Sequence, residues 1–136
     1  MDIHRYAMEA RIRDGQAKLA VDEYEKYLTH QDLDANSPNW VSYLRQGGWA
    51  YLAAGQPRRA LPILERALVL SAAHPYFPGW VAQLRFQIAE ALVATRGDRK
   101  RAESLAEAAH DELVTTPVRK GLLEEVDAWR SKTFGK

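Results

Sequence analysis

The sequence contains no cysteine, which excludes disulfides, thiolate catalysis and cysteine-ligated metal. No apolar stretch approaches the roughly 18 to 20 residues that a membrane-spanning helix needs, and no apolar segment follows the charged N-terminal residues. Neither charge is in excess, because 19 basic and 18 acidic residues leave a formal net charge of +1. We therefore expect a soluble, cytoplasmic protein with no overall attraction to nucleic acid or to an acidic membrane.

Motifs that carry catalytic or metal chemistry are also missing from the sequence. There is no glycine-rich phosphate loop, and no two histidines have a metal-ligand spacing such as four residues apart. None of the histidines lies beside a serine and a carboxylate, so we interpret them as helix-end residues near the local dipole. They are His4, His30, His74 and His110. We expect no catalytic residue, no metal and no cofactor, and hence no enzyme.

The sequence does contain an internal repeat. At 136 residues and 46% apolar composition it is long enough for one domain with its own core. Residues 38–45 (PNWVSYLR) and 78–85 (PGWVAQLR) are identical at five of eight positions, at a shift of 40 residues. The same shift relates Gly15 to Gly55, and we expect it to grow to 42 when Gly55 is aligned with Gly97.

Apolar residues recur at a helical period throughout the repeat, and glycine or proline separates the periodic segments. Ser37-Pro38 and Thr116-Pro117 each combine an N-cap hydroxyl with a proline at the first helical position. No strand pattern competes, so the fold class is all-α with about seven helices. The predicted helices span residues 2–13, 16–30, 38–54, 57–72, 78–95, 98–115 and 117–132.

The second repeat has small and large residues at the spacings typical of the tetratricopeptide repeat (TPR) family. They are Leu44, Gly48, Tyr51, Gly55, Ala60, Leu64 and Ala67. The chain resembles that family, which implies antiparallel helix pairs stacked as a short right-handed solenoid in a single domain, residues 1–136. The repeat units would be residues 1–36, 37–76 and 77–115. Gly48 and Ala60 would let the paired helices approach, with Leu64 filling the space beside them.

The last predicted helix, residues 117–132, fits the role of a cap over the final repeat. Val118, Leu122, Val126 and Trp129 share one face of it, with Leu123 beside them. Two residues elsewhere break the helical rules. Gly47 lies inside a helix with no reason visible in the sequence, and Pro62 predicts a helix that starts late or bends.

The resemblance also implies that the first helix of each pair lines a groove that holds a peptide or helix of a partner protein. The residues at those positions are Arg5, Glu9, Ile12, Ser42, Arg45, Trp49, Leu52, Ala82, Arg85, Ala89 and Leu92. Arg5, Arg45 and Arg85 recur at one position, so they would form a row suited to an acidic segment or a C-terminal carboxylate. The alternative is that they are solubilising arginines in local ion pairs.

The chaperone-binding members of the family pair such a basic residue with an asparagine four residues later. This chain has Glu9, Trp49 and Ala89 in those places, so that clamp is not reproduced. Trp49 is either a binding hot spot or an aromatic packed on a neighbouring helix.

Three functions remain open from the sequence: a module that binds a partner protein, a homo-oligomer that associates through an apolar face or the last helix, and a regulator of another protein. The one basic run, residues 96–101, is interrupted by Asp98 and is a weak signal, so we expect no nucleic-acid partner.

Overall fold

A computed structural model describes residues 10–30, 38–73, 77–116, 118 and 120–135. These residues are helices and the turns between them, in two compact units, Met1–His74 and Pro75–Lys136. The helices are α2 (Ala17–His30), α3 (Pro38–Ala53), α4 (Pro57–Ala73), α5 (Pro78–Ala94), α6 (Arg99–Thr115) and α7 (Leu122–Phe134). None of the helices in the described part of the chain is long and apolar enough to cross a membrane.

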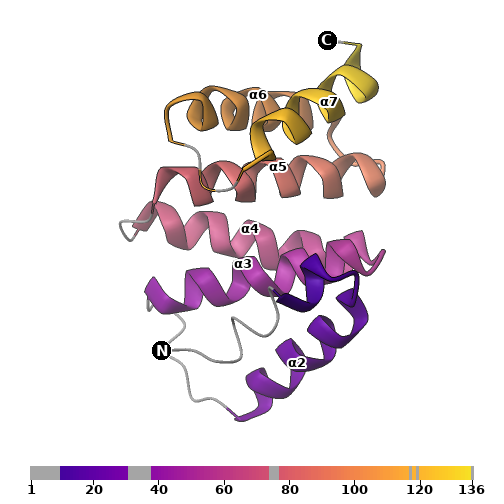
Figure 1. Cartoon of the computed structure of the whole chain (residues 1–136), viewed down its shortest axis with the longest axis vertical. Helices are drawn as coiled ribbons and strands as arrows, with labels where there is room; N and C mark the ends of the chain where they lie inside the picture. The colour runs from indigo at the N-terminus through magenta and orange to yellow at the C-terminus, as the bar shows by residue number, and fades with distance from the viewer. Residues whose placement is uncertain (1–9, 31–37, 74–76, 117, 119, 136) are drawn as a thin grey trace. The chain divides into compact units, whose positions relative to one another are not determined.

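In the first unit, α3 and α4 form an antiparallel pair joined by a short turn, and α2 packs against α3 (Figure 1). Residues 10–13 are the described end of a helix that precedes α2. Leu44 and Tyr51 of α3 and Leu64 of α4 are all buried in this unit. Ala60 and Ala67 are fully buried on the same helix as Leu64, so small residues let the pair approach closely.

Two adjacent glycines explain how α3 is contacted from two sides. A Cβ atom on Gly48 would overlap Leu64 Cδ2 of α4, as the sequence predicts. A Cβ atom on Gly47 would overlap the ring of Tyr24, which reaches α3 from α2. Gly47 is therefore required by a tyrosine of a different helix pair, which is why the sequence around it gives no reason for it.

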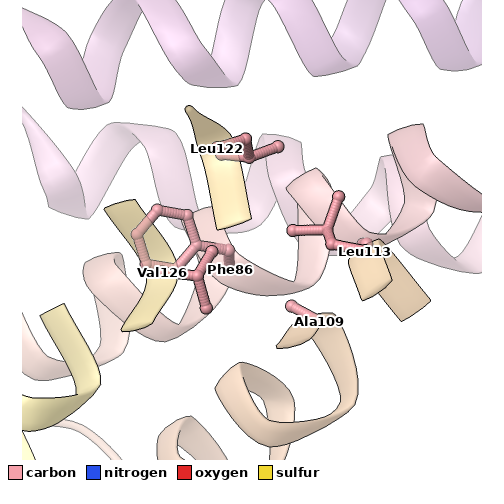
Figure 2. Packing of buried hydrophobic residues seen from close by; sticks show 6 residues of the cluster. Phe86, Ala109, Leu113, Leu122 and Val126 are labelled. Carbon is pink, nitrogen blue, oxygen red and sulfur yellow. The ribbon is translucent and has the colours of Figure 1, made fainter. Parts of the chain in front are cut away.

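In the second unit, α5 pairs with α6, and α7 packs against α6. The core of this unit contains Phe86 of α5, Ala109 and Leu113 of α6, and Leu122 and Val126 of α7 (Figure 2). Val118, Leu123 and Trp129 pack against that core from its edge. The apolar face predicted for the last helix is thus confirmed for Leu122, Leu123, Val126 and Trp129, whereas Val118 reaches the cluster from outside the helix.

The predicted start of the last helix, however, is wrong. Thr116 ends α6, where its hydroxyl donates to the Glu112 carbonyl, and α7 begins at Leu122 after a turn at Gly121. The predicted N-cap therefore belongs to a connection between helices, and its Pro117 lies outside the described residues, as does Ser37 of the other predicted cap. Val118 of that connection fills the space left by Gly79, where a Cβ atom would overlap Val118 Cγ1.

The turn between the two helices of a pair is closed by an equivalent hydrogen bond in three places. Gly15 N–H donates to the Ile12 carbonyl, Gly55 N–H to the Leu52 carbonyl and Arg96 N–H to the Val93 carbonyl. The donor residue is left-handed in each case, with φ of 77° at both glycines and 58° at Arg96. The structural equivalent of Gly55 is therefore Arg96, and the alignment of Gly55 with Gly97 in the sequence analysis is off by one residue.

The other predicted helices agree with the structure to within one residue at each described end. Pro62 lies inside α4, which begins at Pro57, so the suggestion of a late start is wrong. His110 is also not a helix-end residue: its Nδ1 lies 2.6 Å from Asp127 Oδ1, which links α6 to α7.

Candidate functional site

The residues predicted for a partner-binding groove differ widely in exposure. Arg5 and Glu9 lie outside the described residues. Ile12, at the end of the helix before α2, is only 9% exposed and belongs to the core of the first unit. Arg5 and Glu9 therefore stay predictions for the partner-binding groove. Ile12 is a packing residue.

Most of the accessible residues of the predicted groove lie on helix α3. Ser42, Trp49 and Leu52 are half-buried, whereas Arg45 is only 4% exposed. Ser42, Arg45 and Trp49 each take part in an interaction within the chain. A buried guanidinium with internal partners has little left to offer a carboxylate from outside. The expectation of an exposed arginine at this position is therefore wrong for Arg45.

Helix α5 carries fewer accessible residues of the predicted site than α3 does. Arg85 is half-buried, but Ala82 and Ala89 are fully buried and Leu92 is 6% exposed. Among the predicted residues that the structure describes, the partly accessible ones are Ser42, Trp49 and Leu52 of α3 and Arg85 of α5. The predicted row of three arginines stays a prediction, since Arg5 is not described and the other two lie in separate units.

Beneath the α3 surface lies a group of aromatic rings that fixes the orientation of this helix. The ring of Tyr24 stacks on Tyr43 at a centroid distance of 5.3 Å and meets Tyr51 edge-on at 6.0 Å. Trp40, one turn before, stacks on Tyr43 at 5.8 Å. Such contacts bury large rigid rings, so the side chains on the opposite side of α3 have a well-defined position.

Two tyrosine hydroxyls in this group have raised pKa values. Burial raises the pKa of Tyr24 well above its usual value, with a smaller contribution from Tyr51. Burial also raises the pKa of Tyr51 to about 12, together with the hydrogen bond that its hydroxyl donates to Glu25 Oε1 at 2.6 Å. Both phenols are therefore neutral at ordinary pH, and their role is packing and hydrogen bonding.

Three glutamines are buried, which the sequence does not predict. Gln46 of α3 and Gln83 and Gln87 of α5 are each at most 3% exposed. Polar side chains on the predicted groove helices were not expected inside the protein, and no periodicity distinguishes them from surface glutamines. Within the described part of the chain, no three histidine, cysteine or acidic side chains come together as metal ligands would.

Comparisons with known proteins support one fold. Neither a protein-family model nor a curated protein sequence matches the chain. Among solved structures, the chain is similar to the nearly identical TPR-like repeats of a predicted kinesin light chain from Podosopora anserina. The TM-score is 0.66 at 20% sequence identity, over 96% of this chain and 74% of the other. A variant of the same protein matches with a TM-score of 0.65 at the same identity and coverage.

The chain has a TPR-like repeat fold. The resemblance inferred from Gly48, Tyr51 and Leu64 is thereby confirmed at the level of fold. In a TPR-like repeat, α3 and α5 are the first helices of their pairs and α4 and α6 the second. Among the described residues, the exposed large apolar side chains are Leu19, Val69 and Val114 on second helices and Phe77 at the start of the first helix α5.

Proposed function

We propose that the chain is a protein-interaction module that acts by binding and has no catalytic role. It presents the first-helix face of its repeats to a peptide or helix of a partner protein. The observation that carries this proposal is the TPR-like repeat fold, combined with a fixed face of α3 that leaves Ser42, Trp49 and Leu52 partly accessible. We also propose that the protein is located in the cytoplasm.

Trp49 and Leu52 are the residues we expect to contribute most to binding. A half-buried tryptophan adds large contact area with little loss of side-chain entropy when a partner covers it. Leu52 lies three residues further along, on the same side of α3, and adds apolar area next to it. Ser42, two turns before Trp49 on α3, supplies a polar group at the rim of such a contact. This distribution of an apolar centre and a polar edge is typical of protein interfaces.

The experiment is affinity capture from the lysate of the source organism with three matched proteins. These are the wild type, a double variant Trp49→Ala and Leu52→Ser, and a control variant Val69→Ser on the second helix α4, where Val69 is 69% exposed. We expect a partner that the wild type and the control retain and the double variant loses at unchanged helicity. If all three proteins retained the partner equally, the proposal that the first-helix face binds it would be wrong.

Self-association is the alternative function, and capture of the protein's own sequence would favour it. One of its predicted routes has little support, because Leu122 and Val126 of α7 are fully buried within their own unit. Association through the exposed Val69 or Val114 would be lost in the control variant or in Val114→Ser. The three proteins and Val114→Ser together therefore separate the two functions in one experiment.

A further inference from the structure

One end of the Pro75–Lys136 unit gathers exposed basic side chains from three segments. Arg96 is in the turn between α5 and α6, Arg99 and Lys100 begin α6, and Lys132 is in the last turn of α7. All four are exposed. We call these four residues the basic end.

Arg99 joins the segments of the basic end. Its Nη2 donates a hydrogen bond of 2.5 Å to the Thr133 carbonyl, and its guanidinium lies 5.0 Å from the centre of the Phe134 ring. The end of α7 therefore lies beside the start of α6, as the yellow end of the chain does in Figure 1. Lys132 is brought to the same end of the unit as Arg96 and Lys100 by these contacts.

Two features of the sequence at the basic end are unfavourable for the stability of the fold. The left-handed conformation of Arg96 is adopted by glycine in both equivalent turns, at Gly15 and Gly55. A residue with a side chain is strained there by about 1 kcal/mol or more. The first turn of α6 contains no acidic residue, and cations at a helix N-terminus oppose the helix dipole. Both costly choices add positive charge at the same place, which is a pattern expected of a functional site.

Two acidic residues, Asp98 and Glu103, lie within about one turn of the start of α6. Asp98 is the N-cap of α6, where its carboxylate accepts a 3.0 Å hydrogen bond from the Arg101 backbone N–H. Glu103, one turn into α6, is half-buried and takes part in an interaction within the chain. The four exposed cations are therefore concentrated in a chain whose formal net charge is only +1.

We propose that the basic end binds an acidic segment of a partner protein, a short run of aspartate and glutamate. This rests on the proposed function only in taking a protein as the partner. A patch formed by two helix ends matches a few carboxylates rather than a long polyanion, which overall charge does not attract. The Arg99 guanidinium lies over one face of the Phe134 ring, and Trp129 meets the same ring at nearly a right angle, so this aromatic side chain is used within the unit and not as a free platform for a nucleic-acid base.

The test measures binding of a fluorescent peptide of ten glutamates to the full chain by anisotropy. The triple variant Arg96→Gly, Lys100→Gln and Lys132→Gln removes three cations of the basic end and leaves Arg99 in place to hold α7. Arg96→Gly relieves a strained φ, so the variant keeps its helicity. Each exposed cation is worth up to about fivefold in affinity, so we expect a loss of about 10-fold or more. Raising the salt concentration should weaken wild-type binding.

The matched control changes the same net charge on the other unit, through Lys18→Gln, Arg58→Gln and Arg66→Gln, all at exposed positions. We expect the control to bind the peptide as the wild type does. Equal losses in both variants, no binding by the wild type, or tighter binding of a ten-nucleotide thymidine strand at the same salt would each overturn the proposal. Both variants leave the α3 face intact, so partner capture by that face is tested separately.

Discussion

The two helix pairs α3–α4 and α5–α6 differ in the residues that lie between their helices. In the first pair, Gly48 leaves the space and Leu64 fills it. When the second pair is aligned on its turn, Arg96 matches Gly55, and the residues equivalent to Gly48 and Leu64 are Ala89 and Ala106, both fully buried. The first helix thus keeps a small residue at this position in both pairs, while the residue on the second helix changes from large to small. The comparison teaches that the close approach needs a small residue on the first helix, and that a bulky neighbour such as Leu64 depends on it.

The strongest way to break this comparison is to put a large residue at the small position of the first pair. Gly48→Ile places atoms where the Leu64 side chain already lies, so we expect a loss of about 3 kcal/mol in the free energy of unfolding. Adding Leu64→Ala vacates the space that the new side chain needs and should recover a large part of that loss. Urea unfolding of the two variants measures the difference. A double variant no more stable than Gly48→Ile alone would contradict the dependence of Leu64 on Gly48.

In the second unit, α7 supplies part of the core, so the stability of that unit depends on it. Leu122 is fully buried among Phe86, Leu113 and Val126. Leu122→Ala should cost about 2 to 5 kcal/mol, since the cavity left behind adds to the lost transfer free energy. Thermal unfolding followed by circular dichroism measures it. Lys120→Ala, at an exposed position in the preceding turn, is the control and should change little.

A substitution at Gly47 tests the contact between α2 and α3 in the first unit. Alanine favours a helix interior over glycine by about 1 kcal/mol, so propensity alone predicts a gain in stability. Because the Tyr24 ring occupies the place of the added Cβ atom, we expect Gly47→Ala to lose about 1 to 3 kcal/mol instead. Calorimetry decides between the two signs. A stabilised variant would show that Tyr24 does not pack on Gly47.

The turns provide a smaller contrast between the units. Gly55→Ala should cost about 1 kcal/mol, because φ is 77° there and nothing lies within 4 Å of the added Cβ atom to change the balance. Arg96→Gly should have the opposite sign and gain up to about 1 kcal/mol. Gly97→Ala is the control for the turn equivalence, since a positive φ is found at Arg96 and not at Gly97. Chemical unfolding of the three variants ranks them.

The smallest expected effect is on the pH dependence of the first unit. The pKa of Tyr51 is raised from 10.0 to about 12, so its stabilising contribution is complete below pH 10. It is lost as the pH rises from 10 through 12, because the unfolded chain then ionises first. Absorbance in the near ultraviolet should show tyrosinate appearing late in the folded protein, and Tyr51→Phe should reduce the late fraction. A titration like that of free tyrosine would contradict the buried environment.

Much of this fold could be predicted from the sequence, because helix ends depend on local residues such as Pro38, Pro57 and Gly55. The start of α7 could not, since Thr116-Pro117 is a good helix start locally and only packing against Gly79 makes it a connection. The predicted site was less accurate. A repeat position says where a side chain is attached, but the burial of Arg45 and Ala89 depends on neighbours that are remote in sequence.

The most direct test of the central proposal is site-specific photo-cross-linking in a cell extract. A photoreactive phenylalanine analogue replaces either Leu52 on the first helix α3 or Val69 on the second helix α4. The account predicts a cross-linked partner protein from position 52 and none from position 69. Cross-linking from position 69 alone, or only to a second copy of the chain, would contradict it.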